Sequence, residues 1–221
     1  MNYDEIIGEL KKNANPKNVE GMARFGINPD KTFGISIPFL RKLAKDIKKT
    51  SPDIHILAER LFASGYHEAK ILAGMIDDPQ KVTEKQMDSW IKDFDSWDVC
   101  DQVCMNLFDK TPFAYKKAIE WTKREPEFER RAGFALMACL VWHDKRANDS
   151  QFLPFFPLIK KYATDERNFV KKAVNWALRQ IGKMRPGLKK EALKTAEEIL
   201  KIDSKSAQWI AKDALRELNQ C

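Results

Sequence analysis

The sequence has few of the residues that bind metals or form disulfides, with 4 cysteines and 3 histidines in 221 residues. It contains no C-x-x-C pair and no H-x-x-x-H spacing, so it predicts no metal site and no cofactor. The spacing of Cys100 and Cys104 fits one face of a helix better than a zinc site. Because three of the four cysteines lie in apolar helical stretches, we expect reduced, mostly buried thiols. The residues concerned are Cys100, Cys104, Cys139 and Cys221, and His55, His67 and His143.

Long hydrophobic runs are missing as well. The chain opens with MNYDEIIGELKKN, where acids and lysines stand in place of the apolar run of a secretory signal. The longest apolar stretch, residues 132–142, is about half as long as a membrane-spanning helix needs. The sequence therefore predicts a cytoplasmic protein with no membrane partner.

Acidic residues are outnumbered by basic ones, 32 to 39, which gives a formal net charge of +7. The chain has no basic tail, so the excess Lys and Arg must lie on the folded surface. A basic surface favours an anionic partner, with nucleic acid first. The alternative is a mildly basic charge that serves only solubility.

The apolar residues recur with the period of a helix in nearly every segment, and prolines fall where helices begin or break. No alternating run and no Asn-Gly or Asp-Gly hairpin turn is evident. Residues 14–36 fit a short helix and a glycine-containing turn, and no linker divides the chain. We expect an all-α protein with a single domain over 1–221, and helices over 37–49, 53–63, 68–76, 84–94, 112–124, 127–142, 153–163, 168–183, 188–201 and 207–218.

Every second predicted helix carries a small or apolar residue at a comparable place, at separations of 31, 32, 41 and 37 residues. A helix-pair repeat of this length is typical of HEAT-like solenoids, whose second helices usually line a concave side. The sequence therefore predicts an α-α superhelix with a basic concave face. The recurring positions are Ala69, Cys100, Ala132, Ala173 and Ile210.

The stretch DSWDVCDQ, residues 95–102, places Trp97 and Asp101 four positions apart, on one face of a helix. The simple interpretation is a helix N-terminus that Asp95 or Ser96 caps, with acids in its first turn. An aromatic ring and a carboxylate presented together would also suit a catalytic site. The rest of the chain decides between the two interpretations.

Four stretches, in this order along the chain, resemble the AlkD-type DNA alkylation repair family of HEAT-like repeat DNA glycosylases. A W-x-x-x-D pattern alone has almost no specificity, but the four together on a basic helical repeat chain are fairly specific. They are GMARFGI leading to FGISIPFLRKLAKDI (21–47), SWDVCD (96–101), FERRAGF (128–134) and FVKKAVNWALRQIGK (169–183).

The resemblance implies a role for individual residues. Asp101 matches the catalytic aspartate of the family and Trp97 the tryptophan one turn before it. Arg131 matches the arginine that lies with them at the concave cleft, and Trp176 matches the tryptophan of a later repeat. The chain departs from the family at Ser96, where a further tryptophan is common. The implied partner is double-stranded DNA with alkylated bases, bound by a monomer without a metal.

The implied reaction is hydrolysis of the bond between an N3- or N7-alkylated purine and its deoxyribose, a step of base excision repair. The alkylated purine is cationic and leaves without a general acid, so one carboxylate suffices. Asp101 would stabilise the positive charge that develops on the sugar. Indoles attract cations by about 0.5 to 2 kcal/mol, and an arginine can bind a phosphate with two hydrogen bonds. The resemblance also implies that the base is not flipped into a pocket, unlike in most glycosylases.

Each of these residues also has a purely structural interpretation. Trp97 and Trp176 would be core residues in most helical proteins, and Arg131 would pair with Glu127 one turn before it. Two functional alternatives also stay open: a non-catalytic HEAT-like protein that binds damaged or branched DNA, and a scaffold that binds proteins. We expect the remaining tryptophans to serve core or repeat packing: Trp90, Trp121, Trp142 and Trp209.

Overall fold

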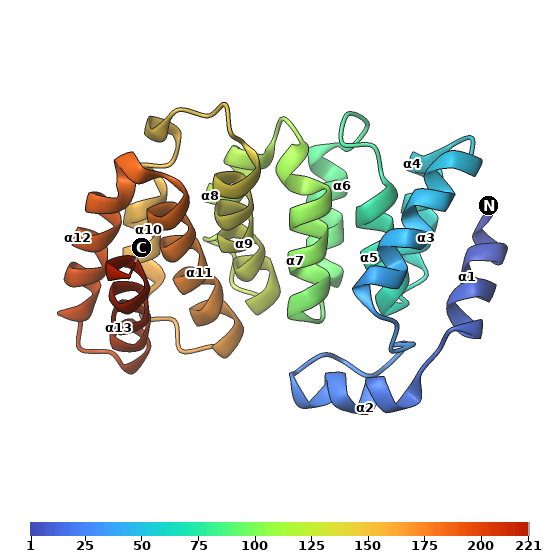
Figure 1. The fold of residues 1–221 in the computed structure, drawn as a ribbon, viewed down its shortest axis with the longest axis horizontal. Coiled ribbons are helices and arrows are strands. Elements are labelled where there is room, and N and C mark those ends of the chain that lie inside the picture. The colour runs from blue at the N-terminus through green and yellow to red at the C-terminus, as the bar shows by residue number, and fades with distance from the viewer. Residues whose placement is uncertain (221) are drawn as a thin grey trace. The chain divides into compact units, whose positions relative to one another are not determined.

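The computed structural model describes residues 1–220, and within them every regular element is a helix. The chain divides into two compact units, Met1–Pro112 and Phe113–Cys221. Both units are drawn in Figure 1. The all-helical fold that the apolar periodicity predicts is confirmed.

The first unit contains seven α-helices and two 3₁₀ turns. Its core includes stacked aromatic rings, with the centroids of Phe62 and Trp90 4.0 Å apart. Within the unit, α5 packs against α3, α4 and α7. The elements are α1 (Tyr3–Lys12), α2 (Pro16–Arg24), α3 (Ile37–Thr50), α4 (Ile54–Ala63), α5 (His67–Ile76), α6 (Glu84–Trp90), η1 (Ile91–Asp93), α7 (Trp97–Asn106) and η2 (Phe108–Lys110).

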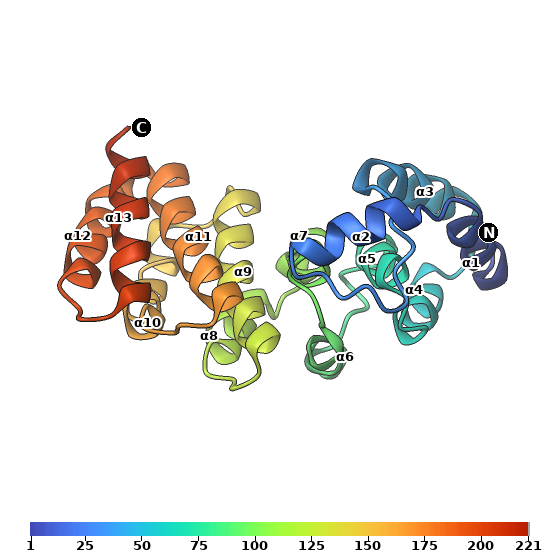
Figure 2. The same cartoon turned by 90° about the horizontal axis from the view of Figure 1, so that it is seen from below.

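Helix α2 differs from its neighbours. It runs crosswise to the other helices of the first unit (Figures 1 and 2), and none of its residues is buried. Pro16 lies at its N-terminal end, where a missing N–H costs nothing, and the side chain of Asn15 caps it. The expected short helix and glycine turn of residues 14–36 are thus confirmed, while α1 was not among the predicted helices.

The second unit consists of three helix pairs, in which α8 packs on α9, α10 on α11, and α12 on α13. Helix α11 also contacts α9 and α13, so the second helices of the pairs form a row. Gly133 lets α8 and α9 approach closely, since a Cβ there would lie 2.6 Å from the nitrogen of Thr122. The elements are α8 (Ala114–Trp121), α9 (Glu127–His143), η3 (Asp149–Gln151), α10 (Phe155–Tyr162), α11 (Asn168–Met184), η4 (Pro186–Leu188), α12 (Lys189–Leu200) and α13 (Lys205–Asn219).

The weak internal periodicity corresponds to real structure. The five recurring residues lie on α5, α7, α9, α11 and α13, and each is fully buried. These positions therefore mark the buried face of each of the five helices. The five residues are Ala69, Cys100, Ala132, Ala173 and Ile210.

The tryptophans divide into two groups. Trp90 and Trp121 are buried as expected, but the core assignment of Trp142 and Trp209 is wrong, since they are 43% and 41% exposed. Trp142 lies in the last turn of α9. Trp209 lies on the exposed face of α13 that also carries Lys212. A helical period alone does not tell which face of an element is covered.

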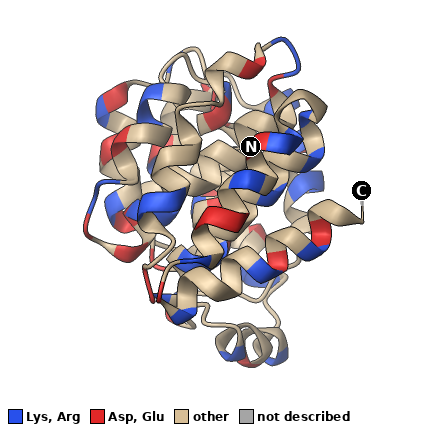
Figure 3. Cartoon of the chain, turned by 90° about the vertical axis from the view of Figure 1, so that its left-hand side faces the viewer, with Lys and Arg blue, Asp and Glu red and all other residues tan. Residues whose placement is uncertain are grey.

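Charged residues of both signs lie side by side on the second unit. Seen from the side of α12 and α13, Lys and Arg are interspersed with Asp and Glu (Figure 3). Lys160, for example, lies 2.8 Å from Glu198. Within residues 1–220, no helix is both long and apolar enough to span a membrane. Cys100, Cys104 and Cys139 are buried thiols, as predicted, and Cys221 lies outside the described residues.

Candidate active site and adjoining cavity

Helix α7 begins at Trp97, but not through the expected cap. Ser96 occupies the N-cap position, yet its side chain forms no capping hydrogen bond. Its buried Oγ has no hydrogen-bond partner among residues 1–220. Asp98 instead accepts a hydrogen bond from the backbone N–H of Val99 at 3.0 Å. Residues 95–102 thus contain the expected helix N-terminus, with Ser96 at the N-cap position but without a capping hydrogen bond from its side chain.

Trp97 and Asp101 lie one turn apart at the start of α7, and both are partly exposed. The indole Nε1 of Trp97 donates a hydrogen bond to the carbonyl oxygen of Phe25 at 3.1 Å. This bond ties the tryptophan to the residue that follows α2 and fixes the plane of its ring. Trp97 is therefore not a fully buried core residue.

The first turn of α7 is joined to the first turn of α5 by a buried ion pair. His67 Nε2 and Asp98 Oδ2 are 2.9 Å apart, and the His67 side chain is almost fully buried. Burial opposes the charged ring, but the hydrogen bond and charge of Asp98 outweigh it. Together with Glu68 and Asp95, they raise the pKa of His67 above its usual value. The pair thus holds α7, and with it Trp97, against α5.

The loop that connects α2 to α3 is held by one buried carboxylate. Glu68 accepts hydrogen bonds from the backbone N–H groups of Phe33, Gly34 and Ile35, at 2.8, 2.7 and 3.0 Å. Gly34 has a φ of +79°, and a Cβ there would lie 2.3 Å from the carbonyl oxygen of Asn15. Only glycine fits this position without strain. Glu68 and Gly34 together set the place of α2.

A cavity of about 450 Å³ lies between α2, its following loop, α5 and α7. Its walls are mostly apolar, and α2 contributes Met22 to them without burying it. The indole of Trp97 forms part of the wall. The apolar lining residues are Met22, Phe25, Ile27, Ile35, Ile37 and Ile71.

The polar groups of this cavity come mainly from helix N-termini. His67, Asp98 and Trp97 lie in the first turns of α5 and α7, and Gln102 follows one turn later. The side-chain oxygen of Gln102, Oε1, accepts a hydrogen bond from Asn106 Nδ2 at 3.1 Å. Among residues 1–220, its amide NH₂ forms no hydrogen bond. The polar lining residues are Lys17, Asn18, Ser36, His67, Asp98 and Gln102.

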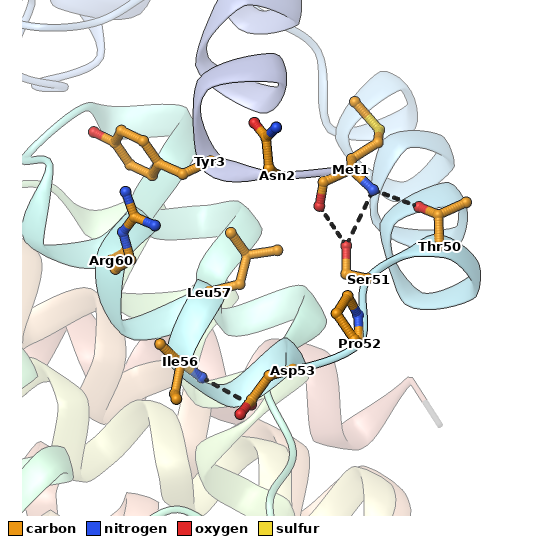
Figure 4. Close-up of a pocket in the computed structure, with 10 residues that line it drawn as sticks. All are labelled: Met1, Asn2, Tyr3, Thr50, Ser51, Pro52, Asp53, Ile56, Leu57 and Arg60. Carbon is orange, nitrogen blue, oxygen red and sulfur yellow. Dashed lines mark hydrogen bonds between the residues drawn. The ribbon is translucent and has the colours of Figure 1, made fainter.

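A further cavity of about 400 Å³ lies near the start of the chain, between the segment before α1 and the start of α4 (Figure 4). The amino group of Met1 donates to Thr50 Oγ1 at 2.9 Å, and the hydroxyl of Ser51 donates to the Met1 carbonyl at 2.7 Å. This cavity is lined by none of the predicted site residues.

Arg131 lies on α9 in the second unit and is only 5% exposed. Its Nη1 donates to the carbonyl oxygen of Phe169 on α11 at 2.6 Å. Glu127, the partner that the structural interpretation gave to Arg131, accepts a hydrogen bond from the N–H of Phe169 at 3.2 Å. Glu127 thus accepts from the backbone N–H of Phe169, and Arg131 donates to its carbonyl oxygen. The two hydrogen bonds fix α11 on α9.

Arg130, next to it, has a structural role. It donates to the carbonyl oxygen of Thr122 at 3.0 Å and to Asp165 at 2.8 Å, and its guanidinium lies 4.8 Å from the ring centre of Tyr162. Burial would raise the pKa of Asp165, but hydrogen bonds from Arg167 and Arg130 lower it below its usual value. Arg130 is therefore committed to the interior.

Trp176 is partly exposed on α11. The residue before it, Asn175, is buried and donates to Asp213 of α13 at 2.7 Å. Trp176 is therefore not a fully buried core residue. Of the predicted site residues, Trp97 and Asp101 belong to the first unit, while Arg131 and Trp176 belong to the second.

The sequence interpretation missed two features, the His67–Asp98 pair and Glu68. A signal for Glu68 existed, because HEAKILAGMI (67–76) places three ionisable residues in the first four positions of an otherwise apolar helix. Acids near an N-terminus are so common that the signal was not specific. Within residues 1–220, no group of three or more His, Cys, Asp or Glu side chains is placed to hold a metal ion.

The sequence was compared with family models, curated proteins and solved structures. The model of the DNA alkylation repair enzyme family matches residues 6–218. The chain belongs to the DNA alkylation repair enzyme family. No curated protein matches it.

One similar solved structure is described as representing a new family of proteins related to the HEAT-like repeat DNA glycosylases with affinity for branched DNA structures. It shares 23% identity with this chain at a TM-score of 0.80, and covers 98% of this chain and 95% of that one. The fold of this family member is thus that of the HEAT-like repeat DNA glycosylases, as the resemblance implied.

Proposed function

We propose that this protein is a DNA N-glycosylase that hydrolyses the glycosidic bond of cationic N3- or N7-alkylated purines in double-stranded DNA. The observation that carries the proposal is the first turn of α7. There, Trp97 and Asp101 are both partly exposed in a family member whose match covers residues 6–218. The proposal treats 1–221 as one functional domain to which both units contribute.

Asp101 is the residue proposed to act on the reacting bond. As the bond to the purine stretches, positive charge develops on the deoxyribose, and a fixed carboxylate stabilises that charge more than it stabilises the intact nucleotide. The alkylated purine carries its own positive charge, so departure needs no general acid. The carboxylate also orients the attacking water. Asp101 keeps its place because the His67–Asp98 pair fixes the same turn of α7.

Three residues are proposed to hold the DNA. The indole of Trp97, fixed by its hydrogen bond to Phe25, packs against the cationic nucleotide and its sugar. Trp176 does the same from α11. Arg131, which also donates to the carbonyl oxygen of Phe169, binds a phosphate through its guanidinium. In this proposal the lesion stays in the duplex, and the enzyme acts in base excision repair in the cytoplasm as a monomer without metal or cofactor.

The experiment that tests the proposal is release of 7-methylguanine and 3-methyladenine from methylated duplex DNA, followed by chromatography of the free bases. The wild-type protein should release both, and Asp101→Asn should release neither. Neutral lesions such as uracil and hypoxanthine should stay in place, because their departure needs a proton that this site does not supply.

A second candidate is a non-catalytic protein that binds damaged or branched DNA. The similar solved structure favours it, because that protein is described as having affinity for branched DNA. Ser96 also favours it, since the resemblance places a further tryptophan there. This candidate predicts tighter binding to a four-way junction than to a linear duplex of equal length, and no base release by the wild type.

A further inference from the structure

The cavity beside Trp97 is not used by the proposed reaction. Asp101 is not among the residues that line it, although Trp97, Asp98 and Gln102 of the same helix are. A volume of about 450 Å³ lies within the usual range of small-molecule sites, which runs from roughly 300 to 1,000 Å³. The kind of ligand that this cavity could bind must be inferred from its lining residues.

The shape of the apolar surface points to a flat, uncharged ligand. Met22 of α2, Phe25 directly after it and Ile71 of α5 offer dispersion contacts, and the Trp97 indole offers a ring for stacking. Phe25 is 72% exposed, which is unusual for a large apolar side chain unless another surface covers it. An amphipathic helix that buries none of its residues has left its apolar contacts unmade.

The polar groups select the kind of ligand. Asp98 already contacts His67 through Oδ2 and the Val99 N–H through Oδ1, and each oxygen keeps a further lone pair that can accept from a neutral N–H donor. Gln102 presents an amide NH₂ that no residue in 1–220 accepts from. A donor and an acceptor at the edge of an apolar slot match the edge of a purine, which offers both a ring nitrogen and an exocyclic or ring N–H.

We propose that this cavity binds a free purine base. The reaction assigned to Asp101 would yield such a base one helical turn away, so the cavity holds the product of that site. Trp97 connects the two, because its Nε1 is bound to the carbonyl of Phe25 beside α2. The inference rests on the family and on the cavity, and binding of the base itself does not require catalysis by Asp101.

Glycine 21 offers a direct test. Gly21 lies in the middle of α2 and lines the cavity, and a Cβ added there meets no atom within 4 Å. Gly21→Leu should therefore fill the cavity without strain. Gly8, on α1, is the matched control: it is also a helical glycine with open space around its Cβ, and it does not line the cavity. Gln102→Met keeps the volume of the side chain and removes its amide.

Equilibrium dialysis with free adenine and free 3-methyladenine measures the binding. We expect saturable binding by the wild type, by Gly8→Leu and by Asp101→Asn, and at least tenfold weaker binding by Gly21→Leu and Gln102→Met. Thermal melts confirm that the variants are folded. Absence of saturable binding by the wild type, or equal binding by Gly21→Leu, would overturn the proposal. Loss of base release in an enzyme that still binds adenine would instead contradict only the proposed function.

A duplex containing 2-aminopurine separates a free base from one still attached to DNA, because this base fluoresces when it leaves the stack. If the cavity receives the base only after release, the fluorescence should not rise with the wild-type protein, and this is the result we expect. A rise that Gly8→Leu retains and Gly21→Leu loses would mean that the cavity takes the base while it is attached. That outcome still supports the cavity. A rise of equal size in both variants would count against it.

Discussion

His67 Nε2 lies 2.9 Å from Asp98 Oδ2, and this one contact joins the N-terminal turns of α5 and α7. Asp98 is the residue after Trp97, and it also accepts the N–H of Val99. The position of the tryptophan therefore depends on a pair of side chains to which the proposed reaction assigns no step. We regard His67 and Asp98 as positioning residues.

The pair makes the stability of the protein depend on pH. The pKa of His67 is raised in the folded state, so its contribution is fully present below the unfolded value of about 6.5 and is lost as pH rises through the folded pKa. Urea unfolding of the wild type and of His67→Gln, at pH values on both sides of this window, measures the difference. We expect the free-energy difference to shrink as pH rises. A constant difference would show that His67 carries no extra charge in the fold.

Glu68 should contribute far more to the free energy of unfolding than an exposed acidic residue does. Glu68→Gln keeps the shape but weakens three backbone hydrogen bonds to a charged acceptor, each typically worth about 1.5 to 3 kcal/mol. We expect the free energy of unfolding to fall by at least one such bond, as measured by urea titration. Glu59→Gln, at an exposed position of α4, is the control and should change stability by less than about 0.5 kcal/mol. Equal effects at both sites would remove Glu68 from this role.

Truncating Trp97 should impair activity more than stability. The side chain is partly exposed, whereas Trp121 is fully buried. Trp121→Ala should cost roughly 3 to 5 kcal/mol, and Trp97→Ala clearly less. Thermal melts run beside a base-release assay compare the two. A melting temperature that falls as far in Trp97→Ala as in Trp121→Ala would favour a packing role for Trp97.

Arg131 has a proposed phosphate contact and an observed structural one, and a matched pair of variants separates them. Arg131→Ala should weaken duplex binding and lower the log–log salt slope by about 0.9, the value for one phosphate. Glu127→Gln weakens the other hydrogen bond to Phe169, the one from its backbone N–H, without removing positive charge. It should leave the salt slope unchanged in fluorescence anisotropy titrations. The same change of slope in both variants would mean that Arg131 acts only through the fold.

The sequence predicted the helices well because a helix needs only local periodicity and its breakers. The range 37–49 became α3 (Ile37–Thr50), and 168–183 became α11 (Asn168–Met184). The repeat was visible for the same reason, since Ala132 and Ala173 mark places where helices approach closely. Which face of a helix a neighbouring helix covers is not a local property. The exposure of Trp142 and Trp209 was therefore predicted wrongly.

The site shows the same limit. Trp97 and Asp101 could be predicted to share a helix face because four positions along a helix is a local relationship. The contact between His67 and Asp98 spans 31 positions, and the bonds from Glu68 span 33 to 35. Such contacts depend on how α5, α7 and the loop before α3 pack. The open space at Gly21 depends in addition on α2 lying crosswise to its neighbours, which no periodicity predicts.

The most direct test of the central claim is single-turnover release of 7-methylguanine from duplex DNA by the wild type and by Asp101→Asn, with duplex binding measured on the same samples. Asparagine keeps the shape of the side chain and removes the charge that opposes the developing cation on the sugar. Each tenfold loss of rate corresponds to about 1.36 kcal/mol in the barrier, and we expect a loss of at least a thousandfold with binding changed only a few-fold. Release by Asp101→Asn at the wild-type rate would contradict the account.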